Sequence, residues 1–198
     1  MLLMSGCTPK SDVKAINAFD FGGECLHGCW LGINTGITTA EEALNILRKS
    51  NQIDQGRLKV LDDGVQAVWS TKNPKYIIAP AYIEFENNLV KSVLISNIYD
   101  FTLRDFINIL GEPDKIAIKT YETPHGELEV MFSIYYQSRK VAASALGSWD
   151  GPNPNNPLNG VFLNVNVEFL KEDVQPWLGY GNLENYLPGQ ELPKEPNQ

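Results

Sequence analysis

Two helix patterns that recur 63 positions apart constrain the fold of this chain more than any other feature. The first pattern, residues 39–47, begins with a Thr-x-x-Glu capping box, and its apolar residues have the i, i+3, i+4, i+7 spacing of a buried helix face. The second, residues 102–110, has the same cap, with Thr102 and Asp105 in the positions of Thr39 and Glu42, and the same spacing, and it ends at a Gly-Glu-Pro sequence. The same offset aligns residues 65–70 with residues 128–133, which predicts an internal duplication. The alternative is two unrelated amphipathic helices that precede strands.

Strand-like segments follow each predicted helix. In these segments apolar and polar residues alternate, which is typical of antiparallel sheet with one packed face. We therefore expect an α+β fold of two tandem repeats, each a helix followed by an antiparallel β-meander, with the helices on one face of the sheet. The predicted strands are residues 57–61, 65–71, 76–86 and 89–96 after the first helix, and 115–121, 127–137, 140–145 and 161–169 after the second.

The repeats divide the chain into five predicted segments. A long loop rich in proline and asparagine interrupts the second repeat. The last residues contain several prolines and few apolar residues. The predicted boundaries are 1–7 for a truncated signal segment, 8–30 for a tether and cysteine-containing lead-in, 31–98 for repeat 1, 99–170 for repeat 2 with its loop at 147–160, and 171–198 for an aromatic strap and disordered tail.

The entry and exit of the two helices resemble those of known small modules. Gly-Ile-Thr-Thr at Gly36–Thr39 leads into the first helix, and Leu-Gly-Glu-Pro-Asp at Leu110–Asp114 leads out of the second. Over about residues 31–145, a helix followed by a small antiparallel sheet resembles the SmpA/OmlA-type and β-lactamase-inhibitor-protein-like modules of secreted bacterial lipoproteins. The resemblance implies a protein that acts through its surface as a binding or assembly component, with no catalytic residues to carry over.

Four residues near the start of the chain also resemble a known motif. Met4-Ser5-Gly6-Cys7 resembles the lipobox of bacterial lipoproteins, in which cleavage precedes the cysteine and that cysteine carries the lipid. The resemblance implies Cys7 as the lipid attachment residue, which would hold the protein at the cell membrane on its extracytoplasmic face. The polar residues 8–12 that follow are suited to a tether. The alternative is that Cys7 is a buried or free cysteine.

The other two cysteines, Cys25 and Cys29, form a close pair. In an oxidising extracytoplasmic compartment, an even and closely spaced pair is most simply a disulfide. The alternatives are reduced structural thiols, a metal site or a redox pair. A four-ligand zinc site would need every remaining cysteine and histidine, since the chain has only two histidines, and the spacing differs from Cys-x-x-Cys.

The charge balance and the motif content argue against two large classes of function. The chain has 16 Lys and Arg against 24 Asp and Glu, a net charge of −8, and no basic cluster that could neutralise several phosphates. We therefore expect no nucleic-acid partner. The nucleophile-elbow, phosphate-loop, dinucleotide and zinc-protease motifs are absent, and His125 lies in a predicted turn. We predict no catalytic residue and no cofactor, so the protein is not expected to be an enzyme.

Residues 147–160 are the predicted loop that is most suited to contact a partner, because long loops in compact domains are often functional. Trp149 and Asp150 are the candidate partner-binding residues, since aromatic side chains are common anchors in interfaces. The alternative is that the Trp149 ring folds back over the sheet. Asp150, Asn153 and Asn155 lack the spacing and the terminal Glu of a calcium loop, so no metal site is predicted.

Together these features predict a lipid-anchored, extracytoplasmic protein that works as a non-catalytic binding or envelope-assembly module. Its expected partners are the membrane surface, through the lipid on Cys7, and a protein of the cell envelope. One alternative is a small-molecule or sensory domain, which would need an apolar pocket of a few hundred cubic ångströms between the repeats. A hydrolase that uses carboxylates of raised pKa in a deep cleft is a further alternative.

Overall fold

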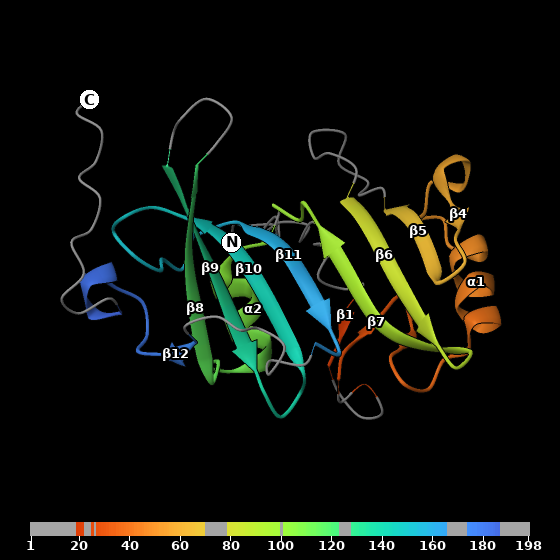
Figure 1. Cartoon of the computed structure of the whole chain (residues 1–198), viewed down its shortest axis with the longest axis horizontal. Coiled ribbons are helices and arrows are strands. Elements are labelled where there is room, and N and C mark those ends of the chain that lie inside the picture. Colours follow the sequence, from red (N-terminus) through yellow and green to blue (C-terminus); the bar gives the residue numbers. More distant parts are fainter. Residues whose placement is uncertain are drawn as a thin grey trace, which may run out of the picture.

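The computed structural model describes residues 19–21, 25, 27–69, 79–99, 101–122, 128–165 and 174–186, and these residues form two antiparallel sheets with two α-helices (Figure 1). The helices are α1 (Ala40–Lys49) and α2 (Leu103–Leu110), and two 3₁₀ turns, η2 (Gln55–Arg57) and η4 (Leu183–Asn185), accompany them. The small sheet contains β1 (Phe19–Asp20), β2 (Cys29–Trp30) and β3 (Ile33–Asn34). The large sheet contains β4 (Lys59–Val60), β5 (Gly64–Trp69), β6 (Ala79–Glu86), β7 (Leu89–Ser96), β8 (Lys115–Glu122), β9 (Leu128–Tyr136), β10 (Val141–Gly147), β11 (Leu158–Leu163) and β12 (Gln175–Pro176).

The large sheet has nine strands in the order β12-β8-β9-β10-β11-β7-β6-β5-β4. Two hairpin-connected series, β4–β7 and β8–β11, meet where β11 pairs with β7, with Val161 opposite Ile95. The hydrogen-bonded ladder therefore continues from one series into the other without a gap. The two-residue strands β4 and β12 form the edges, and short edge strands limit pairing with other chains.

The predicted fold class, an α+β fold of two tandem helix-plus-meander repeats, is wrong. In the described residues the structure is mostly β, with two α-helices, one continuous nine-stranded sheet and a separate three-stranded sheet. The alternation of side chains located β5 to β11 but carries no information on which strand edges pair across the chain. It therefore could not predict the β7–β11 junction or the small sheet, whose strands have only two residues each.

The capping boxes predicted for both helices are confirmed. The Thr39 hydroxyl accepts a hydrogen bond from the Glu42 amide at 3.2 Å, while the Glu42 carboxylate accepts one from the Thr39 amide at 2.9 Å. Thr102 and Asp105 make the same reciprocal pair at the start of α2. Each box satisfies amide groups that lack partners within the first helical turn.

Backbone carbonyl groups from distant turns complete both helix N-termini. The amide of Ala40 donates to the Asn88 carbonyl at 3.0 Å. The amides of Leu103 and Arg104 donate to the carbonyls of Asn156 and Pro154, each at 3.0 Å. The last two acceptors belong to the loop between β10 and β11, which therefore fixes the start of α2 to the sheet.

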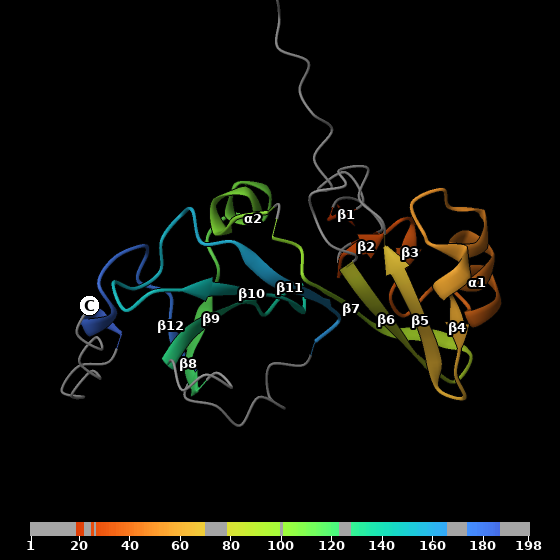
Figure 2. The same ribbon diagram turned by 90° about the horizontal axis from the view of Figure 1, so that it is seen from above.

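The small sheet lies beside α2 on the same side of the large sheet (Figure 2). Trp30 of β2 and Ile33 of β3 are fully buried. They belong to one core with residues of both helices and of the inner face of the large sheet, which is the face that the helices cover. The Phe21 and Phe106 rings pack edge to face at 5.7 Å between centroids. Two short helices leave apolar surface of so long a sheet uncovered, and the small sheet covers part of it.

The described part of the C-terminal segment also packs on the domain. Leu183 and Tyr186 are buried in the main core, and β12 extends the sheet beside β8. The amide of Gly181 donates to the Pro152 carbonyl at 3.0 Å, which joins this segment to the loop after β10. No helix in the described ranges has the length and apolar character needed to cross a membrane.

Candidate functional site

The large sheet has one face that carries neither helix, and we call it the helix-free face. Val65, Ile83 and Ile95 point into the main core with both helices, so the residues that alternate with them lie on the helix-free face. One row of directly paired residues crosses this face from strand to strand. The row is Lys59, Gln66, Tyr82, Leu94, Phe162, Ala142, Tyr135 and Lys115.

The two halves of this row differ in exposure. Tyr135 and Ala142 are only 3% exposed, and with Ala117 they form a second apolar cluster against which Phe162, Val165 and Val174 pack. At β5–β7 the side chains of Tyr82 and Leu94 are half-buried and Gln66 is exposed. Along this row, the helix-free face is therefore buried at β8–β10 and more accessible at β5–β7.

A half-open groove of about 350 Å³ lies at the accessible end. This volume is at the lower limit of the range for small-molecule sites, about 300–1,000 Å³. The floor comes from β5, β6 and β7, and one wall comes from η2 and β4. The lining residues are Arg57, Lys59, Gln66, Ala67, Val68, Pro80, Ala81, Tyr82, Leu94 and Ser96.

Among the described residues, the lining of the groove includes two cations and no carboxylate. Arg57 has a nearby acidic partner, since its Nε atom lies 3.4 Å from Oδ2 of Asp54. Lys59 has no ion-pair partner within the described part of the chain. The wall formed by η2 and β4 is therefore positive, although the chain as a whole has a charge of −8.

Tyr82 lies on the groove floor, and its hydroxyl has a hydrogen-bond partner, Asp63, that does not line the groove. Desolvation by burial, followed by a hydrogen bond to Asp63 and the charge of that carboxylate, raises the pKa of Tyr82. Gly64 leaves the room for this arrangement, because a Cβ atom there would lie 3.2 Å from the Tyr82 hydroxyl and 2.3 Å from the Ile83 carbonyl oxygen. The phenol therefore donates to Asp63, and its ring forms part of the groove.

A second group of polar and aromatic side chains comes from β8, β9 and β11 and from the residues that follow β7. The Tyr99 hydroxyl lies 3.2 Å from the side-chain oxygens of both Asn97 and Asn159. The Tyr121 hydroxyl donates to the Glu129 carboxylate. This hydrogen bond, together with burial and the carboxylate charge, raises the pKa of Tyr121 to about 12.

The structure places the predicted partner-binding residues on the loop after β10. The half-buried Trp149 ring packs against the main core, as in the alternative considered for it, and Asp150 is exposed, with its carboxylate 3.4 Å from the Ser148 hydroxyl. Neither residue lines the groove. That both residues bind a partner stays a prediction.

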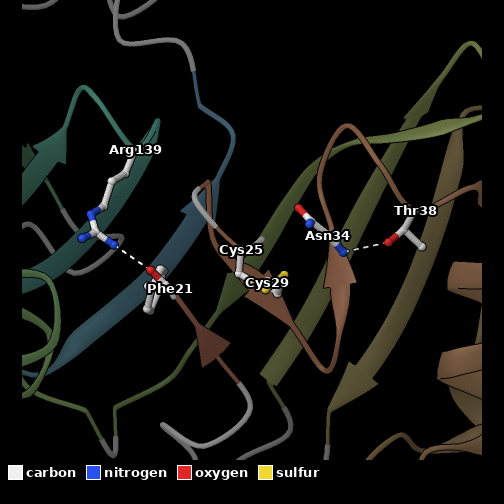
Figure 3. The surroundings of a disulfide bond; sticks show 6 residues. All are labelled: Phe21, Cys25, Cys29, Asn34, Thr38 and Arg139. Carbon is white, nitrogen blue, oxygen red and sulfur yellow. Dashed lines mark hydrogen bonds between the residues drawn. A yellow bond between two sulfur atoms is a disulfide. The ribbon is translucent and has the colours of Figure 1, made fainter. Parts of the chain in front are cut away.

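The predicted disulfide is present between Cys25 and Cys29, with an S–S distance of 2.04 Å. It lies in the segment that leads into β2, beside the hydrogen bond from Arg139 to the Phe21 carbonyl at 2.8 Å (Figure 3). Cys7 and His125 lie outside the described residues.

A metal-ligand group of three or more His, Cys, Asp or Glu side chains does not occur among the residues that the structure describes. In the loop after β10, the side-chain oxygen of Asn153 accepts from the Asn155 amide at 2.9 Å, and that of Asn156 accepts from the Asn153 amide at 2.6 Å. These asparagines therefore shape the turn.

Sequence analysis missed the groove. The alternation in β6 indicated that Tyr82 lies on the opposite face from Ile83, but Arg57 and Lys59 had no motif to single them out. Their approach to Tyr82 depends on the β4–β5–β6 register, in which Lys59 pairs with Gln66 and Gln66 pairs with Tyr82.

Comparisons of the chain with protein-family models, with curated proteins and with solved structures found no match. Any assignment of function therefore has to come from the residues of this chain and from their geometry.

Proposed function

We propose that the protein is a non-catalytic binding module of the cell envelope that recognises its partner through the accessible end of the helix-free face. A lipid on Cys7 holds it at the extracytoplasmic face of the cell membrane. The observation that carries the proposal is the groove over β5–β7, where half-buried Tyr82 and Leu94 lie beside a positive wall.

The two faces of the large sheet differ in what they offer a partner. The inner face is filled by α1, α2 and the small sheet, which share one continuous core with it. The helix-free face offers a concave site with apolar floor residues and a few polar groups, and such sites are the usual form of a binding pocket. This contrast supports binding at the helix-free face.

The cysteines support the extracytoplasmic location. Disulfides persist in oxidising compartments and are rare in the reducing cytosol. The disulfide between Cys25 and Cys29 is therefore consistent with a protein on the outer side of the membrane.

Site-specific photo-crosslinking tests the binding face. A photoreactive amino acid replaces Gln66, which is exposed on the groove, or Ile37, which is 63% exposed and does not line it. In cells that make the protein natively, we expect a discrete adduct from position 66 and none from position 37. Adducts from position 37 alone, or from neither position, would contradict the proposed binding face.

Intact mass and detergent partitioning test the anchor. The gene is expressed together with its upstream region in a bacterial host. Cleavage before Cys7 with added acyl chains, together with partitioning into the detergent phase, is the expected result. An unmodified chain that stays in the aqueous phase would exclude the lipid anchor but would leave the groove to be judged by crosslinking.

A further inference from the structure

We infer that the groove binds a small amphiphilic anion, a carboxylate carried on an apolar body. The inference rests on the proposed function only in taking the helix-free face as the binding face. It adds the chemical class of the ligand that this face recognises.

Charge complementarity indicates the sign of the ligand. Within the part of the chain that the structure describes, Arg57 and Lys59 are the charged residues that line the groove, and both lie on the wall formed by η2 and β4. The carboxylate of Asp54 lies beside Arg57 and also accepts a hydrogen bond from the Gly56 amide at 3.0 Å, so it is held in its own turn. A ligand carboxylate at this wall would face Lys59, which has no carboxylate partner in the described ranges.

The Asp63 carboxylate limits the position of the ligand charge. It is bound to the Tyr82 hydroxyl and does not line the groove. The Glu84 carboxylate does not line the groove, and it pairs at 2.9 Å with Lys91, which also lies 3.4 Å from the Glu86 carboxylate. Anion binding is therefore favoured beside Lys59, at the β4 side of the groove.

The floor indicates the body of the ligand. Val68, Tyr82 and Leu94 are half-buried side chains of neighbouring strands on the helix-free face, and they present apolar surface beside the wall. Burial of apolar surface favours binding. A ligand that combines an anionic group with a short apolar chain would use both the wall and the floor, whereas acetate or an uncharged alcohol would use one of them.

Four probes separate these contributions. Octanoate, octanol and octylamine each have eight carbon atoms and differ in the charge of the head group, and acetate supplies the carboxylate with a single methyl group. Binding is measured from amide shifts in two-dimensional NMR spectra of the full chain. We expect octanoate to shift the amides of Gln66, Tyr82 and Leu94, with an affinity at least tenfold higher than that of octylamine or acetate.

Substitution of Lys59, in the positive wall, tests the inference further. Lys59→Gln should lower the affinity for octanoate about fivefold to tenfold and leave octanol binding unchanged. Lys49→Gln is the matched control, because Lys49 is an exposed lysine of α1 that does not line the groove. Equal affinities for octanoate and octylamine, shifts away from the groove, or an unchanged affinity in Lys59→Gln would each overturn the inference. The crosslinking result at position 66 would still decide the proposed function.

Discussion

At the residue scale, the absence of a side chain at Gly147 allows a close approach in the large sheet. Gly147 ends β10 against the ring of Phe132, and a Cβ atom at this position would lie 1.8 Å from the ring atom Cε2. Phe132 is fully buried in the main core, so its ring has no open space to move into. The backbone of β10 can approach this ring only because position 147 is glycine.

We expect Gly147→Ala to lower the free energy of unfolding by about 1–3 kcal/mol, because the added methyl group overpacks the core. Urea denaturation of the purified variant measures the change. Gly56→Ala is the control, since Gly56 is exposed and its nearest group would be the Asp54 side chain at 3.3 Å. It should change the stability by less than about 0.5 kcal/mol. Equal stabilities of the two variants would show that Phe132 rearranges at little cost.

The hydrogen bond between Tyr121 and Glu129 predicts a specific pH dependence. It is the largest cause of the raised pKa of Tyr121, about 12 against an ordinary value of 10.0. A raised pKa in the folded state favours folding below pH 10, and this contribution is lost as the pH rises through about 12. Tyrosinate absorbance, compared with that of Tyr121→Phe, should show Tyr121 titrating closer to 10 in Glu129→Gln. An unchanged titration would assign the shift to burial.

At the element scale, local sequence determined the helices, and long-range contacts determined the sheet. The capping boxes at Thr39 and Thr102 involve residues three positions apart, so the chain alone was sufficient to predict them. The pairing of β7 with β11 and the register that brings Lys59 near Tyr82 join distant segments. Periodicity indicates which face a side chain occupies but not which strand lies beside it, so the groove could not be predicted.

Thr39→Ala tests the contribution of a cap. Loss of the hydroxyl leaves the Glu42 amide without its acceptor and should reduce the stability by about 1 kcal/mol. Thr39→Ser keeps the hydroxyl and should recover most of the loss. Thermal unfolding followed by circular dichroism provides the comparison. If both variants are equally destabilised, the effect lies in the threonine methyl group and not in the cap.

At the scale of the whole molecule, the small sheet connects the parts that cover the inner face of the large sheet. Phe19 and Phe21 of the β1 segment pack edge to face on Phe101 and Phe106, which lie just before and within α2. Arg139, in the turn between β9 and β10, donates to the Phe21 carbonyl. Removing the small sheet would therefore expose core from both series of strands.

The Cys25–Cys29 disulfide constrains the entry to this small sheet, and its removal is the test at this scale. A loop this short restricts the unfolded chain only modestly, so the paired substitution Cys25→Ser and Cys29→Ser should lower the unfolding free energy by about 2 kcal/mol. A reducing agent should destabilise the unmodified protein by a similar amount and leave the variant unaffected. Because the groove lies on the other face of the large sheet, octanoate should still shift the Gln66 amide in the folded variant. Loss of that shift in a folded variant would mean that the inner core controls the shape of the groove.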